Sequence, residues 1–131
     1  MDIRKDYTID APRDAVWAAL TDPEVIERWG GGPAVMAAAP GFAFSMWGGD
    51  IHGKVVEVDP GRLMVQEWYG GAWPSPSIAR FTLSDEPGGG TRVELLNTGV
   101  PDAEAADIDT GWDDYYMGPL ANLLEEGEDE A

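Results

Sequence analysis

The most regular pattern in the sequence lies near its C-terminal end, between Thr110 and Glu126. Apolar residues recur there every three or four positions, which places them along one side of an α-helix, while the opposite side is acidic. The apolar positions are Trp112, Tyr115, Tyr116, Leu120, Leu123 and Leu124. Thr110 is predicted to cap the first turn, and Pro119, which has no N–H to donate, is predicted to bend the helix. Because a one-sided helix of this length is not stable alone in water, it must lie on another element.

The first thirty residues predict one strand followed by two short helices. Residues 2–9 alternate loosely between apolar and polar, as a strand does. Pro12 is expected to open the first helix, because proline suits the first helical position. Asp22 and Pro23 are expected to cap and open the second helix, which ends at the glycines of residues 30–32.

From residue 33 to residue 98 the pattern changes to short strands separated by glycine and proline turns. The predicted strands cover residues 34–39, 42–47, 51–59, 62–69, 77–84 and 91–98. Residues 99–109 are expected to form an acidic loop with one helical turn at 102–106. Consecutive strands joined by short turns favour an antiparallel meander. The sequence therefore predicts an α+β fold of about seven strands, in which the C-terminal helix covers one face of the sheet.

The length and composition narrow the classes of protein that the chain can belong to. The 131 residues suit a single domain, predicted at residues 1–126, followed by an acidic, disordered tail at 127–131. With no cysteine and one histidine, His52, the sequence excludes disulfides, thiolate catalysis and a histidine-rich metal site, and no cofactor is expected. No apolar run reaches the length of about 20 residues that crosses a bilayer, so membrane insertion is not expected. The N-terminal residues contain no apolar signal segment, so a cytoplasmic location is expected.

The formal net charge of −17 limits the classes of binding partner that the protein can attract. Such a charge repels nucleic acid and anionic membranes at long range, so neither is expected as a partner. The charge is interpreted as a solvated acidic surface of the kind found in salt-adapted proteins. Attraction of cationic partners remains open as the alternative.

The alternation of side chains along each predicted strand indicates which residues face the helix. In the strand 51–59, Val56 and Val58 are predicted to point inward, and this places Lys54 and His52 on the same face. The same rule applied to the other strands predicts a mostly apolar cavity with a few polar groups, as expected of a small-molecule site. The predicted cavity lining is Phe42, Phe44, Met46, His52, Met64, Gln66, Trp68, Phe81, Asn97, Trp112 and Tyr116.

Few residues suggest catalysis. His52 is the one group expected to titrate near neutral pH, so it is the candidate acid, base or hydrogen-bond donor, while a half-exposed position at a strand start is the alternative. Trp47 and Trp73 lie beside turns, where they could border the cavity or form a partner surface; Trp73 is predicted to be a mobile lid residue. The glycines of residues 88–90 are interpreted as a hairpin loop and not a phosphate cradle, since no helix follows them.

Four segments taken together resemble a known superfamily. They are IDAPRDAVWAALTDPEVIERWG (9–30), GKVVEVDPGRLMVQEW (53–68), ARFTLSDEPGGGTRVELLNTG (79–99) and GWDDYYMGPLANLLEE (111–126). In this order they resemble the START/Bet v 1-like superfamily, also called SRPBCC, in the branch similar to the C-terminal domain of the activator of Hsp90 ATPase (AHSA1-like). The resemblance implies a helix-grip fold: a curved, seven-stranded antiparallel sheet that grips the C-terminal helix, with two short helices after the first strand and a cavity under the long helix.

The resemblance implies three alternative functions. The first is binding of a small hydrophobic or amphipathic ligand in the cavity, without catalysis. The second is a cyclase- or hydrolase-like enzyme in which His52 acts with Gln66, Asn97 or a tyrosine. The third is an Hsp90-associated protein that binds through Trp47 and Trp73. These residues contain no counterpart of the N-terminal domain through which the activator would contact the chaperone, so Hsp90 activation is not expected. A homodimer is the expected alternative to a monomer.

Overall fold

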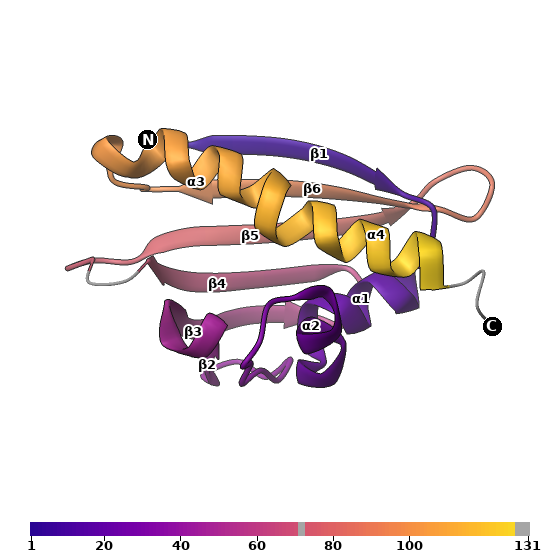
Figure 1. Ribbon diagram of the computed structural model, residues 1–131, viewed down its shortest axis with the longest axis horizontal. Coiled ribbons are helices and arrows are strands. Elements are labelled where there is room, and N and C mark those ends of the chain that lie inside the picture. Colours follow the sequence, from indigo (N-terminus) through magenta and orange to yellow (C-terminus); the bar gives the residue numbers. More distant parts are fainter. Residues whose placement is uncertain (71–72, 128–131) are drawn as a thin grey trace.

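The computed structural model describes residues 1–70 and 73–127, which form an antiparallel sheet crossed by a long helix (Figure 1). The sheet has six strands in the order β1-β6-β5-β4-β3-β2. The strands are β1 (Ile3–Ile9), β2 (Ala43–Met46), β3 (Ile51–Asp59), β4 (Leu63–Gly70), β5 (Ser77–Asp85) and β6 (Thr91–Thr98). The helices are α1 (Arg13–Thr21), α2 (Pro23–Trp29), the short turns η1 (Trp47–Gly49) and η2 (Asp102–Glu104), and the long helix formed by α3 (Ala105–Gly111), η3 (Trp112–Met117) and α4 (Gly118–Gly127). The architecture confirms the predicted α+β helix-grip fold.

The predicted count of seven strands is wrong, because residues 34–39 do not form a strand. This segment meets the sheet through one isolated bridge between Val35 and Ser45. A strand needs a continuous ladder of hydrogen bonds, and this weakly apolar alanine-rich segment makes only two such bonds, both between Val35 and Ser45. Val35 is 53% exposed, so its side chain contributes little to the core.

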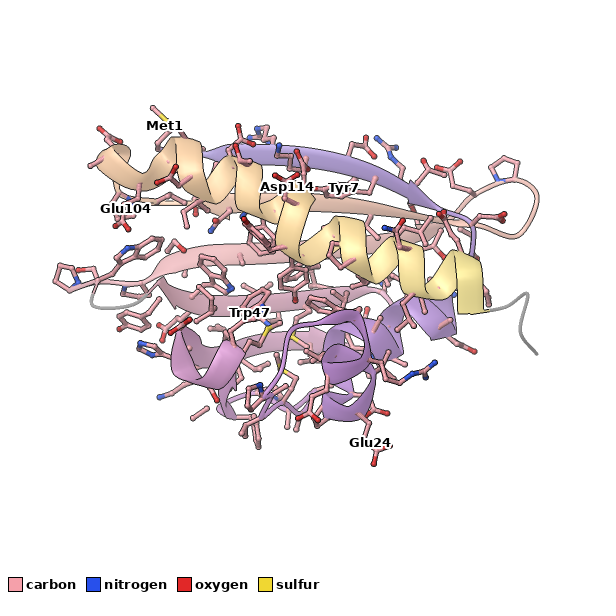
Figure 2. All side chains as sticks on the ribbon, in the orientation of Figure 1. Met1, Tyr7, Glu24, Trp47, Glu104 and Asp114 are labelled. Atoms are coloured by element: carbon pink, nitrogen blue, oxygen red, sulfur yellow. The ribbon has the colours of Figure 1, made fainter. Side chains whose placement is uncertain are left out.

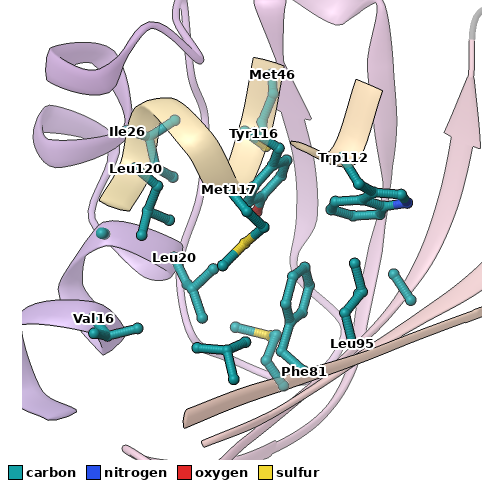
Figure 3. Close-up of a cluster of buried hydrophobic side chains, with 14 of the residues drawn as sticks. Val16, Leu20, Ile26, Met46, Phe81, Leu95, Trp112, Tyr116, Met117 and Leu120 are labelled. Atoms are coloured by element: carbon teal, nitrogen blue, oxygen red, sulfur yellow. The ribbon is translucent and has the colours of Figure 1, made fainter. Parts of the chain in front are cut away.

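The core lies between the inner face of the sheet and the three main helical segments. Figure 3 shows Trp112, Tyr116, Met117 and Leu120 of the long helix in one cluster with Phe81 and Leu95 of the sheet. Leu20 of α1 and Ile26 of α2 close the same cluster and are fully buried. Packing on this apolar surface stabilises the one-sided helix that would not persist alone.

The second helix begins and ends as the sequence predicts, whereas Pro12, expected at the first position of the first helix, lies just before α1 as its N-cap. The Asp22 carboxylate accepts a hydrogen bond of 3.0 Å from the backbone N–H of Glu24, and Pro23 opens α2. Gly30 ends α2 in the left-handed conformation at φ 106°, which a residue without Cβ adopts at no steric cost. The Trp29 indole then donates to the carbonyl of Ala19 at 2.9 Å, which joins α2 to α1.

The long helix starts earlier than predicted, so Thr110 is not its cap. Thr110 lies inside α3, which follows the turn η2 directly. The helical turn predicted at residues 102–106 is present, but the helix continues through residues 107–109, which were predicted as loop. Carboxylates near a helix N-terminus are stabilised by the helix dipole. The irregularity expected at Pro119 takes the form of a π-helical turn, η3, in which the N–H of Gly118 donates to the carbonyl of Asp113. The helix continues through the proline to residue 127; of the predicted tail, residues 128–131 lie outside the described residues.

A polar contact holds the long helix against the edge strand β1. The Tyr7 hydroxyl donates to one oxygen of the Asp113 carboxylate at 2.7 Å, and the Lys5 ammonium donates to the other at 3.0 Å. Lys5 also pairs with Asp109, one turn earlier on the helix. The hydrogen bond from Tyr7, together with Lys5, holds the pKa of the Asp113 carboxyl below its usual value.

Replacing Asp113 with asparagine is expected to lower the free energy of unfolding by about 1 kcal/mol at pH 7. A carboxyl whose folded pKa is depressed contributes stability above its unfolded pKa of about 3.9, and this contribution is lost as the pH falls through the folded pKa. The difference between wild type and Asp113→Asn should therefore shrink toward zero in urea unfolding at pH 2 to 3. Asp114→Asn, at the next and exposed position, is the matched control; an equal loss in both variants would contradict the assignment.

Within residues 1–70 and 73–127, no helix is long and apolar enough to cross a membrane.

Candidate functional site

An apolar pocket of about 330 Å³ lies between the sheet and the first half of the long helix. Its walls come from η1, the starts of β3 and the long helix, and the end of β4. The lining residues are Trp47, Asp50, Ile51, Trp68, Asp107, Ile108, Gly111, Trp112, Tyr115 and Tyr116. Five of these ten side chains are aromatic, so we call this site the aromatic pocket. A mostly apolar concave wall with a few polar groups is typical of small-molecule sites.

A larger hollow of about 420 Å³ lies over β1, β6 and β5. Its lining is largely charged and includes Lys5, Asp6 and Glu94. Lys5 and Asp6 are already paired, with Asp109 and Asp113 and with Arg92 respectively. Arg4 and Arg80, in the same lining, form no ion pair with the described residues, but the described lining of the hollow has no aromatic side chain. The aromatic pocket, with its mostly apolar walls, is therefore the candidate small-molecule site.

Trp47 is held at the pocket by an unusual backbone conformation. It has φ 50°, in the left-handed region that residues with a Cβ seldom adopt. Its indole N–H donates to the carbonyl of Gly30 at 2.8 Å, and its ring lies 6.1 Å from that of Trp29 and 6.0 Å from that of Tyr116. Figure 2 shows Trp47 beside the long helix and the α2 region. Strained backbone that the surroundings hold in place often accompanies a functional site.

A chain of hydrogen bonds fixes Trp112 on the helix side of the pocket. Its indole N–H donates to Oδ1 of Asn97 at 3.1 Å, and Nδ2 of Asn97 donates to Oγ of Ser77 at 3.0 Å. The Ser77 hydroxyl in turn donates to the carbonyl of Trp68 at 2.9 Å. The rings of Trp112 and Trp68 stack with centroids 5.1 Å apart. The Asn97 amide is therefore engaged in orienting Trp112 and joining β5 to β6.

Two lining residues carry buried polar atoms without a hydrogen-bond partner among the described residues. They are the hydroxyl of Tyr116, which is 2% exposed, and the indole N–H of Trp68, which is 4% exposed. Gln66 Oε1 and the Trp73 indole N–H also have no hydrogen-bond partner among the described residues. Burial raises the pKa of the Tyr116 hydroxyl, so it stays protonated and neutral. The Tyr116 oxygen and the Trp68 nitrogen are both almost inaccessible to solvent, so they belong to the packed side of these rings and not to the open surface of the pocket.

The predicted cavity residues divide into two groups in the structure. Trp68, Trp112 and Tyr116 line the aromatic pocket. The others that lie on the inner side fill the core, with Phe42 half-buried at its margin and the rest buried: Phe44, Met46, Met64, Gln66, Phe81 and Asn97. Aromatic rings thus occupy much of the space that the sequence analysis assigned to a cavity.

The predicted inward orientation of His52 is wrong. Gly53 of β3 lies between Phe44 of β2 and Trp68 of β4, its partners on the two neighbouring strands. The side chains of Phe44 and Trp68 are buried, so Gly53 is on the inner face of the sheet. His52 is one position away, so it lies on the outer face with Tyr69, on whose ring it stacks at 5.1 Å. The same shift exposes Lys54.

A bulge in β3 causes this error. The register shifts between Val55 and Glu57, so the inward alternation passes through Val55, which is fully buried, while Val56 is 47% exposed. One extra residue moves every preceding side chain to the other face. The alternative of an enzyme built on His52 therefore lacks its central residue at the cavity.

Sequence reasoning missed seven lining residues of the aromatic pocket. They are Trp47, Asp50, Ile51, Asp107, Ile108, Gly111 and Tyr115. Trp47 was expected beside a turn, where it could border the cavity or form a partner surface, but it was not included in the predicted lining; its neighbours Gly48 and Gly49 were a signal that the chain turns back there. Trp73, expected as a mobile lid, instead packs edge-on against Trp68 at 6.0 Å. The two residues before it, 71 and 72, lie outside the described residues.

The site contains no evident metal centre. Among the described residues, no group of three or more histidine, aspartate or glutamate side chains is arranged to hold a metal ion.

The fold and the position of the pocket define a class of protein. A curved antiparallel sheet gripping a long C-terminal helix is the Bet v 1-like, or SRPBCC, architecture. Residues 10–125 match the family described as activator of Hsp90 ATPase homolog 1-like protein, and the chain belongs to this family.

Known relatives agree with this assignment. The chain is 27% identical over 117 residues to the activator of 90 kDa heat shock protein ATPase homolog 2 of Mus musculus, covering 88% of this chain and 35% of the relative. The chain spans about a third of the length of the curated relatives that it matches. Among solved structures, DynU16, from the dynemicin biosynthetic locus, is 28% identical with a TM-score of 0.81, covering 96% of this chain and 48% of that protein. The Aha1 dimer from Colwellia psychrerythraea shares the fold at a TM-score of 0.81 and 20% identity, with 98% of both chains covered.

Proposed function

We propose that this protein binds a small amphipathic molecule in the aromatic pocket. The observation that carries the proposal is a mostly apolar pocket lined by five aromatic side chains, with the exposed carboxylates of Asp50 and Asp107 in the same lining. The apolar rings provide surface to bury, and the two carboxylates provide points of orientation. The volume of about 330 Å³ suits a molecule of one or two rings.

Filling the pocket from Gly111 is expected to abolish binding without unfolding the protein. Gly111 has φ −62° and ψ −35°, which any residue adopts in a helix, and a Cβ placed there would meet no atom closer than 3.9 Å. The Gly111→Leu side chain would then extend along a pocket wall. Binding of the uncharged fluorescent probe N-phenyl-1-naphthylamine should weaken at least tenfold, equivalent to about 1.4 kcal/mol.

The matched control for this experiment is Gly111→Ala, which adds one methyl group and leaves most of the pocket open. Its affinity for the probe should stay within about threefold of the wild type, or 0.7 kcal/mol. Equal binding by wild type and Gly111→Leu would place the probe elsewhere and refute the proposal. Native mass spectrometry of freshly purified protein is an independent check, because a bound cellular ligand would appear as an added mass that Gly111→Leu lacks.

We propose association with Hsp90 as the second candidate function. The family match and the mouse relative support it, since both are named as activators of the Hsp90 ATPase. Pull-down with Hsp90 from the same organism, across salt concentrations, tests it. Failure at every concentration would refute it.

The oligomeric state is tested separately by light scattering of the purified protein. The molar mass should be twice 14.1 kDa if the chain forms a dimer as the Colwellia protein does.

A further inference from the structure

The charged groups at the aromatic pocket all have one sign. Its lining, as far as residues 1–70 and 73–127 form it, includes the carboxylates of Asp50 and Asp107 and no lysine, arginine or histidine. Asp50 comes from the turn before β3, and Asp107 comes from α3 across the opening. Both residues are exposed, and neither carboxylate forms an ion pair with the described residues. They contrast with Asp6, Asp109 and Asp113, which the few basic side chains neutralise.

The walls below these carboxylates also favour positive charge. Trp47, Trp68, Trp112, Tyr115 and Tyr116 present aromatic rings, whose negative faces attract ammonium and guanidinium groups. Tryptophan is the strongest of the aromatic side chains in this interaction, and three tryptophans line this pocket.

An anionic ligand would meet the opposite conditions. It would place its charge beside two carboxylates, within a molecule of net charge −17, and find no basic side chain among the described lining residues. A neutral ligand would gain from the rings alone. A cation gains from the rings and from the carboxylates, and the second gain weakens as salt screens it.

We propose that the molecule bound in the aromatic pocket is a cationic amphiphile, an aryl or alkyl amine whose charged end lies near Asp50 and Asp107. This inference rests on the proposed function and adds the ligand's chemical class to it. The amine end is held at the rim by the two carboxylates, and the apolar body packs against the tryptophans.

Three probes that share one scaffold test the charge preference. They are 3-phenylpropylamine, which is cationic at pH 7, the neutral 3-phenylpropanol and the anionic 3-phenylpropanoate. Each is titrated into the full chain, with displacement of N-phenyl-1-naphthylamine as the readout. The amine is expected to bind about tenfold more tightly than the alcohol at low salt, the carboxylate is expected to bind most weakly, and the preference should fall as salt is added.

Two double variants separate the pocket from the overall charge of the protein. Asp50→Asn with Asp107→Asn should reduce the amine preference to below about threefold, or 0.7 kcal/mol, while alcohol binding stays unchanged. Glu24→Gln with Glu57→Gln removes the same charge from exposed positions that do not line the pocket, and should leave the preference intact.

Each outcome decides one of the two proposals. If the alcohol binds as tightly as the amine, the inference of a cationic ligand is wrong and the proposed function stands. If both double variants lose the preference equally, the preference comes from the whole surface and the inference is also wrong. If the fluorescent probe itself does not bind to the wild type, the proposed function fails first.

Discussion

Replacing Trp112 with alanine is expected to lower the free energy of unfolding by about 3–5 kcal/mol. The side chain is 2% exposed, stacks on Trp68 and lies edge-on to Phe81, so its removal opens a large cavity under the long helix. It also removes the donor to Asn97 Oδ1, and this oxygen would then be buried without that hydrogen bond. Urea unfolding followed by circular dichroism measures the loss.

Two further variants make this result interpretable. Tyr115→Ala, three residues along the same helix, removes a side chain that is 69% exposed, and should change the stability by less than about 0.5 kcal/mol. Trp112→Phe keeps one ring and should lose about 1–3 kcal/mol, which gives a measurable value if the alanine variant does not fold. A loss of less than about 1 kcal/mol for Trp112→Ala would show that the long helix is not docked through this residue.

Gly118→Ala is expected to destabilise the protein by about 1–3 kcal/mol, although alanine favours helices over glycine. A Cβ at Gly118 would lie 2.3 Å from the carbonyl oxygen of Asp113, which is the acceptor of the π-helical hydrogen bond from Gly118 itself. Backbone atoms cannot move aside as a flexible side chain can. The substitution must therefore distort η3, the segment that carries Trp112 and Tyr116 into the core.

Gly111→Ala, at the other end of the π-helical turn, is the matched control for this substitution. Its nearest neighbour would be Cδ2 of Tyr115 at 3.9 Å, an ordinary contact. The change should stabilise the protein by about 0.4–1 kcal/mol, since it reduces the entropy of the unfolded chain without strain. Thermal unfolding of the two variants should thus shift in opposite directions. A shift of the same sign in both would contradict the assignment of strain to Gly118.

Most of the fold could be predicted from the sequence because its signals are local. The Asp22-Pro23 start of α2 depends on atoms within one turn, and the turn at residues 60–61 depends on the conformations open to proline and glycine. The stripe of apolar residues on the long helix likewise predicted which side packs on the sheet, since Trp112, Tyr116 and Leu120 are buried, although Tyr115 of the same stripe is exposed.

The errors arise where a local pattern depends on a distant partner. The inward placement of His52 assumed unbroken alternation along β3, but the bulge at residues 55–57 is formed by the pairing with β4. The segment 34–39 was predicted as a strand from its turns, although whether it pairs is decided by the neighbouring chain. Neither outcome is visible in the residues of the segment itself.

The amino-acid sequence alone determined the class of fold, the acidic charge and the aromatic, cysteine-free composition, because these follow from local propensity and from counting. The tertiary structure decided which aromatic rings fill the core and which line the pocket. It brought Trp47 and Asp50 of one turn against Asp107 and Tyr116 of a helix more than fifty residues later. Contacts of this kind depend on how the helix lies across the sheet, and packing of the whole core sets that arrangement.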